Sequence, residues 1–181
     1  MTASNGTSCE AWTIASARAE DADALALIGA ASFLETFAGI LDGAAIISHC
    51  GVAHAPNYYA ERLKAGAAAW LARVEYGAPI GYALLDKPQL PEVEVREDDL
   101  ELKRIYALSR FQGGGLGRAL MATAQDEARR RGAKRLLLGV YAQNQRALAF
   151  YARAGFVGLG QRRFSVGGRE YEDMILARDL A

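Results

Sequence analysis

The stretch SRFQGGGLGRAL, residues 109–120, contains the residues whose spacing points most directly to chemistry. Gly113, Gly114 and Gly115 are consecutive, and Gly117 follows two residues later. Glycine tolerates positive φ and lets another group approach the main chain, but it weakens regular structure. The cluster therefore indicates either a mobile turn or a loop whose backbone N–H groups hold a phosphate.

Two common phosphate-binding loops do not fit these glycines. Counted from Gly113, the dinucleotide pattern G-x-G-x-x-G places Arg118 where the last glycine belongs. A P-loop ends in Gly-Lys-Ser/Thr, whereas this one ends in Gly-Arg-Ala. The pattern that fits is Gln112-x-x-Gly115-x-Gly117 between a strand and a helix, where main-chain N–H groups and a helix N-terminus face an anion.

The flanking segments predict the elements that must position this loop. Residues 100–108 indicate a strand before it, and the continuous apolar run 135–141 is typical of a strand buried on both faces. A second helix is expected over residues 145–154, before Gly155. One face of the helix that directly follows the glycines is marked by Leu116, Leu120, Met121, Ala124 and Ala128.

The first half of the chain predicts further strands and helices. A strand is expected over residues 12–18, one or two amphipathic helices over 20–40, and another helix from Pro56. Residues 42–56 show no firm periodicity. Two apolar runs between residues 68 and 86 predict an antiparallel hairpin, and two strands around Gly167 and Gly168 close the chain. The sum is a mixed α/β sheet.

Composition limits the class of protein. The 181 residues are 51% apolar and 23% charged, with no net charge, which is typical of one globular domain and predicts neither nucleic-acid nor membrane binding. We expect a flexible tail over residues 1–10 and a single domain over 11–181. The N-terminus lacks a basic and apolar signal segment, so we expect a cytoplasmic protein.

The cysteines and histidines do not predict a metal site. Cys9 and Cys50 are too few for a disulfide framework and are expected to be free thiols. His49 and His54 lie near Cys50, but three candidate ligands with irregular spacing and no fourth partner seldom bind a metal.

The glycine loop resembles motif A of the GCN5-related N-acetyltransferase (GNAT) superfamily, whose Gln/Arg-x-x-Gly-x-Gly/Ala loop holds the pyrophosphate of acetyl-CoA. About thirty residues later, NQRALAFYARAGF resembles motif B of the same family. The resemblance implies an α/β (α+β) fold with a mixed, mostly antiparallel sheet of about seven strands. It also implies about four flanking helices and a splay between strands 4 and 5, where the pantetheine arm of the co-substrate enters.

The resemblance also implies which residues bind acetyl-CoA. The main chain of the strand before the loop would contact the pantetheine arm, and the Ala107 N–H would polarise the thioester carbonyl. Asn144 would contact the same arm, or it is simply a helix N-cap. The implied cofactor-binding residues are Ile105, Tyr106, Ala107, Gln112, Gly113, Gly114, Gly115, Leu116, Gly117, Arg118, Asn144 and Phe150.

Acetyl transfer needs an acid for the departing thiolate and a base for the amine. Tyr151 occupies the position of the tyrosine that motif B enzymes use as general acid; alternatively it only packs in the core. Glu101 lies where several family members carry a catalytic glutamate, or it is a solvated carboxylate. Its even separation from Ala107 predicts that both side chains lie on one face of the strand.

The acceptor follows from a narrower resemblance, to PaiA-type spermidine/spermine N-acetyltransferases, carried by ELKRIYAL, residues 138–176 and ASFLETFAG. Between Asp86 and Glu101 there are seven acidic and two basic residues, which would attract a polyamine, although Arg162 and Arg163 would oppose it. The alternatives are a protein, peptide or other small amine, or a regulatory domain that binds acyl-CoA without turnover. The resemblance implies a homodimer.

Overall fold

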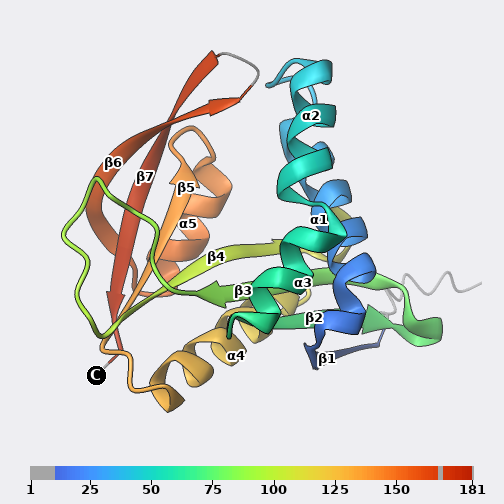
Figure 1. The fold of residues 1–181 in the computed structure, drawn as a ribbon, viewed down its shortest axis with the longest axis horizontal. Coiled ribbons are helices and arrows are strands. Elements are labelled where there is room, and N and C mark those ends of the chain that lie inside the picture. Colours follow the sequence, from blue (N-terminus) through green and yellow to red (C-terminus); the bar gives the residue numbers. More distant parts are fainter. Residues whose placement is uncertain (1–10, 167–168, 181) are drawn as a thin grey trace, which may run out of the picture.

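A seven-stranded sheet forms the centre of the computed structural model, which describes residues 11–166 and 169–180 (Figure 1). Its strands are β1 (Trp12–Ala17), β2 (Ala68–Val74), β3 (Pro79–Asp86), β4 (Asp99–Ala107), β5 (Arg135–Tyr141), β6 (Val157–Val166) and β7 (Arg169–Asp179). The spatial order is β1-β2-β3-β4-β5-β7-β6, and only the β4–β5 pair is parallel. This confirms the mixed, mostly antiparallel sheet. The expected tail over residues 1–10 and the turn at 167–168 lie outside the described residues.

Five α-helices flank the sheet within the described ranges. They are α1 (Ala22–Phe37), α2 (Gly43–Ala53), α3 (Pro56–Lys64), α4 (Leu116–Arg130) and α5 (Gln145–Arg153). Helix α2 lies in the stretch without firm periodicity. Its N-terminus is capped by Asp42 Oδ1, which accepts from the backbone N–H groups of Ala44 and Ala45, and it buries Ala45 and Ile46 beside Phe37.

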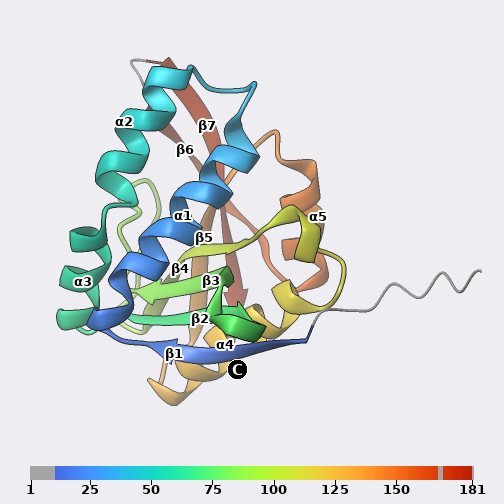
Figure 2. The same cartoon turned by 90° about the vertical axis from the view of Figure 1, so that its right-hand side faces the viewer.

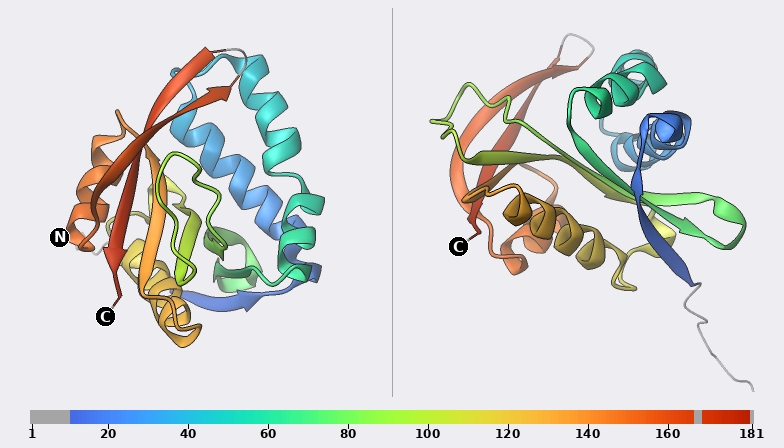
Figure 3. Two further views of the ribbon diagram at one scale, coloured as in Figure 1. Left: turned by 60° about the vertical axis from the view of Figure 1, so that its left-hand side comes forward. Right: turned by 60° about the horizontal axis from the view of Figure 1, so that its bottom comes forward.

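The helices cover the two faces of the sheet unequally (Figures 2 and 3). Helices α1 and α3 pack on one face, where Leu25, Ile28 and Tyr59 meet Leu71 and Tyr82 of the hairpin. Helices α4 and α5 pack on the other face. The apolar stripe predicted for α4 is buried there, since Leu116, Leu120, Met121, Ala124 and Ala128 all belong to that core.

The sheet splays between β4 and β5, as expected. The two strands pair at only three positions, from Asp99–Arg135 to Glu101–Leu137. Beyond these, β4 continues beside β3 and β5 continues beside β7, so the β5–β7–β6 half rises away from the β1–β4 half (Figure 1). The diverging strands leave backbone groups on facing edges without ladder partners.

An ion pair holds the closed end of this splay. Arg135 donates from Nε to Asp99 Oδ1 at 2.9 Å and from Nη2 to Asp99 Oδ2 at 2.7 Å, with both side chains almost fully buried. Burial opposes ionisation of the carboxyl, but the Arg135 hydrogen bonds and charge still lower the pKa of Asp99. The pair thus joins β4 to β5 just before they separate.

A β-bulge interrupts β4 at Lys103. Arg104 pairs with Leu84 of β3 and Leu102 with Leu85, so Lys103 is an extra residue in the ladder. The bulge inverts the alternation of side chains. Leu102, Ile105 and Ala107 consequently contact the α4 core, although Leu102 and Ile105 are an odd number of positions apart.

The acidic segment between β3 and β4 forms a surface loop that packs along the outer half of the sheet (Figure 3). Leu90 and Val93 of this loop contact Leu137, Ile175 and Ala177. Among the described helices, none combines the length and the apolar character needed to cross a membrane.

Candidate functional site

The glycine loop lies between β4 and α4, as predicted. Gly113 and Gly115 adopt positive φ angles of 89° and 92°, a region that disfavours side chains with a Cβ. Gly115 is the N-cap of α4, and no side chain caps the helix there. The first N–H groups of a helix have no partner within it, so this N-terminus can hold an anion.

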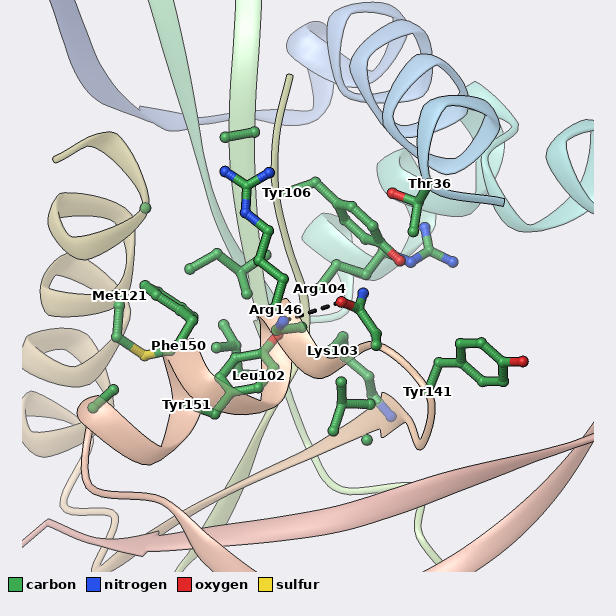
Figure 4. Close-up of a pocket in the computed structure, with 18 of the residues that line it drawn as sticks. Thr36, Leu102, Lys103, Arg104, Tyr106, Met121, Tyr141, Arg146, Phe150 and Tyr151 are labelled. Atoms are coloured by element: carbon green, nitrogen blue, oxygen red, sulfur yellow. Dashed lines mark hydrogen bonds between the residues drawn. The ribbon is translucent and has the colours of Figure 1, made fainter. Parts of the chain in front are cut away.

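The loop opens into a cavity of about 1020 Å³ that extends through the splay to helices α1–α3 (Figure 4). Most of the predicted site residues line it together: Glu101, Ile105, Tyr106, Ala107, Gln112, Gly113, Gly115, Gly117, Arg118, Asn144, Phe150 and Tyr151. Gly114 and Leu116 are not among the lining residues, and the side chain of Leu116, the first residue of α4, is fully buried in the core between α4 and the sheet. Leu116 can therefore offer only its main chain.

Several contacts shape the loop end of the cavity. The side chain of Gln112 donates from Nε2 to the Ala107 carbonyl oxygen at 2.6 Å, which ties the loop back to β4. A Cβ at Gly117 would lie 3.5 Å from the ring of Phe150, so the first turn of α4 packs closely against α5. Figure 4 shows Phe150 beside Met121 at this end.

Tyr151 projects from α5 into the cavity with only 8% of its surface exposed. It packs against Phe150 and Phe156, with ring centroids 5.4 and 5.8 Å away. Burial raises the pKa of Tyr151 well above its usual value, so the phenol keeps its proton. Its hydroxyl makes no hydrogen bond within the described residues, which leaves it available to a bound molecule.

Asn144 is the N-cap of α5. Its Oδ1 accepts from the backbone N–H of Ala147 at 3.0 Å, and the residue also lines the cavity. The side-chain amide can still donate two hydrogen bonds.

The expectation that Glu101 and Ala107 share a face of β4 is wrong, because the bulge at Lys103 lies between them. The side chain of Glu101 lies on the face of β4 opposite to that of its neighbour Leu102, whereas Ala107 lies on the same face as Leu102. Glu101 is 4% exposed, and its Oε2 accepts from Lys103 Nζ at 2.6 Å and from the Gln89 N–H at 2.8 Å. Glu101 is therefore a buried, paired carboxylate where the splay begins.

Arg104 and three polar rings form a network on the α1–α3 side of β4. Arg104 Nη1 donates to the Tyr59 hydroxyl at 2.8 Å and lies 3.4 Å from His54 Nδ1. The Tyr59 hydroxyl also lies 2.9 Å from both His54 Nδ1 and the Tyr82 hydroxyl. Burial, with the nearby Arg104 charge, lowers the pKa of His54 to about 3, so its ring is neutral.

A glycine in α1 makes room for this network. A Cβ on Gly29 would clash with His54 Nδ1 and the Tyr59 hydroxyl. The helix can therefore approach the network only without a side chain at this position.

Sequence reasoning assigned no role to Arg104 or to the aromatic wall of the cavity. That wall consists of Phe33, Phe37, His49 and Tyr58, with Phe33 stacked on His49 at 4.3 Å. The alternation of Arg104 with Ile105 and Tyr106 could have placed Arg104 and Tyr106 on one face. The helices that complete the wall come from distant parts of the chain, so their convergence could not be predicted.

The same network involves His54, one of the three residues considered as metal ligands. His54 Nδ1 is committed to the network, and no group of three or more His, Cys, Asp or Glu side chains in the described part of the chain is arranged to hold a metal ion.

Comparison with known proteins gives consistent matches. The sequence profile of the Acetyltransferase (GNAT) family matches residues 41–156. An uncharacterized N-acetyltransferase of Mycobacterium tuberculosis (strain ATCC 25618 / H37Rv) is 32% identical over 160 residues, which cover 88% of this chain and 98% of the relative.

Two solved structures cover nearly the whole chain. PaiA N-acetyltransferase from Thermoplasma acidophilum, in complex with coenzyme A, has a TM-score of 0.75 at 20% identity. The match covers 93% of this chain and 99% of the Thermoplasma acidophilum chain. Ribosomal-protein-alanine N-acetyltransferase from Brucella melitensis has a TM-score of 0.69 at 26% identity, and the match covers 92% of this chain and 99% of the Brucella melitensis chain. The first likeness shows a shared fold.

Proposed function

Because the chain belongs to the acetyltransferase (GNAT) family and is thus an acetyl-CoA-dependent N-acetyltransferase, we propose that it acetylates a primary amine by direct attack in a ternary complex. One observation carries the proposal. The uncapped glycine N-terminus of α4, the unpaired edge of β4 and the Tyr151 hydroxyl all meet in one cavity. Acetyl-CoA would supply an activated acetyl thioester there.

The backbone of β4 supports the proposed contacts. The Leu108 N–H donates to the Ile80 carbonyl of β3 at 2.9 Å. Since successive N–H groups of an extended chain point to opposite sides, the Ala107 N–H is directed away from β3, into the gap. We propose that Ala107 stabilises the carbonyl oxygen, that the Gly113–Gly117 loop and Arg118 hold the pyrophosphate, and that Asn144 and Phe150 flank the pantetheine arm.

Tyr151 is the proposed general acid. A leaving thiolate has a pKa of ~8.5, and a buried phenol remains protonated until that thiolate forms. The acceptor must also lose a proton, which for an alkylamine at pH 7 costs ~4.6 kcal/mol. Glu101 remains the proposed base, acting through water, since it lines the same cavity but is held by Lys103.

The sequence favours a polyamine as the acceptor, with a peptide or other amine as the alternative. The polyamine proposal rests on the PaiA-type resemblance and on the acidic residues between Asp86 and Glu101, and of these seven acids only Glu101 lines the cavity. Asp86 and Asp99 are paired with Arg62 and Arg135, and the exposed acids Glu92, Glu94, Glu97 and Asp98 are absent from the lining. The Brucella melitensis structure, named for a ribosomal protein alanine, is compatible with a peptide amine.

Two measurements test the proposed function. Titration of coenzyme A into the protein should release heat, and Gly115→Ala should weaken binding at least ~10-fold because alanine is strained at φ 92°. The control is Gly51→Ala in α2, where a Cβ meets no atom within 4 Å and which should bind normally. Thiol release from acetyl-CoA is then measured with spermidine, peptides and amino acids.

The outcomes separate the alternatives. Acceptor-dependent thiol release supports a transferase. Tight coenzyme A binding without release for any amine would favour the acyl-CoA-binding regulatory domain. Absence of binding would contradict both.

A further inference from the structure

The end of the cavity beside the aromatic wall contains a positive charge that no acid among the described residues neutralises. Arg104 is half-buried there and forms no ion pair with any described residue; its polar neighbours are tyrosines and a neutral histidine. By contrast, the two carboxylates that line the cavity, Glu101 and Asp173, are paired with Lys103 and Arg162. A guanidinium that is partly removed from water without a counter-ion is destabilising, and an anionic ligand would relieve this cost.

The hydrogen bonds of Arg104 leave most of its donors available. Nη1 faces Tyr59 and His54, and since arginine can only donate, both partners act as acceptors. The three remaining N–H donors, on Nε and Nη2, have no partner in the described residues. Neither nitrogen is among the fully buried unsatisfied atoms of the described residues, so both keep some accessible surface, and Arg104 lines the cavity.

The surrounding rings hold the guanidinium in place. It lies over the Tyr58 ring at 4.4 Å and near the Tyr59 ring at 5.4 Å. Figure 4 shows Arg104 extending toward Thr36 of α1, beside Tyr106. A guanidinium fixed in this way with an open edge matches the geometry of a carboxylate, which it can bind through two parallel hydrogen bonds.

The remaining charges on the cavity wall are also mostly positive. Besides Arg104 they are Lys103, Arg118, Arg146, Arg153, Arg162 and Arg178. Arg118 lies in the first turn of α4 and Arg146 at the start of α5, near the proposed coenzyme site. Arg104 instead lies on the side of the aromatic wall, over Tyr58. A polycation placed beside Arg104 would meet repulsion without any unpaired acid to offset it.

We propose that Arg104 binds a carboxylate of the acceptor, so that the substrate is an amine that also carries a carboxylate on an apolar body, and not a polyamine. This rests on the proposed function. The acceptor nitrogen forms the new bond and loses its proton, while the carboxylate takes no part in bond making. Its contact with Arg104 orients the nitrogen, and the rings of Phe33, Phe37 and Tyr58 contact the apolar part.

The test uses acceptors that differ only in the anion. Thiol release is measured with L-phenylalanine, L-methionine, β-alanine and 5-aminopentanoate, each beside its carboxamide, and with spermidine. At least one carboxylate should exceed its carboxamide by ~10-fold or more in kcat/KM. A carboxamide lowers the pKa of a nearby amine and frees more neutral nucleophile, so this preference would run against intrinsic reactivity.

Variants assign the preference to Arg104. Arg104→Gln should reduce the carboxylate preference at least ~10-fold, mainly through KM, and Arg104→Lys should reduce it partly because the charge remains but the fork is lost. Arg163→Gln is the matched control, since Arg163 is exposed, pairs with Glu170 and is not among the residues that line the cavity. Thermal unfolding checks that each variant is folded.

Three outcomes would overturn the proposal. They are equal or better use of carboxamides or spermidine, a carboxylate preference that survives in folded Arg104→Gln, and a loss of coenzyme A affinity in that variant instead of a loss of acceptor discrimination. If no amine releases thiol, the proposed function fails separately. The anion site is then tested by calorimetry of L-phenylalanine binding to the coenzyme A complex of the wild type and of Arg104→Gln, where equal or absent binding would overturn it.

Discussion

Tyr151 is buried, and its hydroxyl has no hydrogen-bond partner in the described residues. We predict that Tyr151→Phe lowers kcat ~100-fold or more, the usual contribution of a general acid, and changes the dissociation constant of coenzyme A less than ~3-fold. Because burial raises the pKa of Tyr151, the wild type should lose no activity through this group below about pH 10. Steady-state kinetics and calorimetry measure the two effects.

Tyr171→Phe is the matched control for this prediction. Tyr171 packs beside Phe164 in a separate cluster and does not line the cavity. Equal turnover of Tyr151→Phe and the wild type would remove Tyr151 from the mechanism.

His54 makes stability depend on pH. Its pKa in the folded protein is about 3, below the ordinary value of 6.5, so the unfolded chain binds a proton that the folded protein excludes. The stabilisation is complete above pH 6.5 and is lost as the pH falls toward 3. We predict that wild type loses about 2 kcal/mol of unfolding free energy between pH 8 and pH 5 through this group.

Urea unfolding of wild type and His54→Gln at both pH values measures this loss. The variant is expected to be less stable at pH 8 but to lose less on acidification. Parallel pH profiles for the two proteins would show that His54 is not held neutral.

At the scale of elements, the start of β4 is attached to β5 by the Asp99–Arg135 pair. Removing one member of a buried pair leaves an unpaired charge, so Arg135→Met should cost ~3–5 kcal/mol in urea unfolding. The double variant Asp99→Leu/Arg135→Met should recover much of that loss, because it removes both charges. A double variant no more stable than the single one would show that backbone geometry, not the lone charge, causes the loss.

The bulge in β4 determines on which face of the strand each side chain of the site lies. It separates Glu101 from Ala107 across the strand and places Arg104 next to the aromatic wall. A period of two, counted along the sequence, cannot include an extra residue in the ladder. Glu101, the proposed base, therefore lies on the other face of β4 from Ala107, contrary to the sequence-based expectation. Arg104, which the sequence did not single out, lines the cavity.

At the scale of the whole molecule, the sheet ends in an exposed edge strand. β6 is the outer strand beside β7, and Val157 and Leu159 are exposed on it. An unpaired edge readily pairs with another chain, so we predict a homodimer through β6, as the family resemblance implies. Light scattering after gel filtration should give twice the monomer mass.

Leu159→Lys should shift this dimer toward the monomer. Val52→Lys on the exposed surface of α2 is the matched control and should leave the mass unchanged. A monomeric wild type at micromolar concentration would contradict the prediction.

The sequence by itself determined the local parts of the site. Main-chain requirements at Gly113 and Gly115, the apolar stripe of α4, the buried run of β5 and the capping asparagine of α5 are local signals, because each depends on neighbours within a turn or a strand. These signals predicted the order strand, glycine loop, helix, strand and helix around the site, whereas the splay was implied by the family resemblance.

Only the tertiary structure decided which charges line the cavity. The bulge at Lys103 depends on the register with β3. The absence of the exposed acids of the β3–β4 loop from the cavity lining depends on how that loop packs on β5 and β7. The convergence of α1, α2 and α3 over Arg104 joins residues far apart in the chain. Electrostatic recognition is set by distance and burial, which local patterns do not encode.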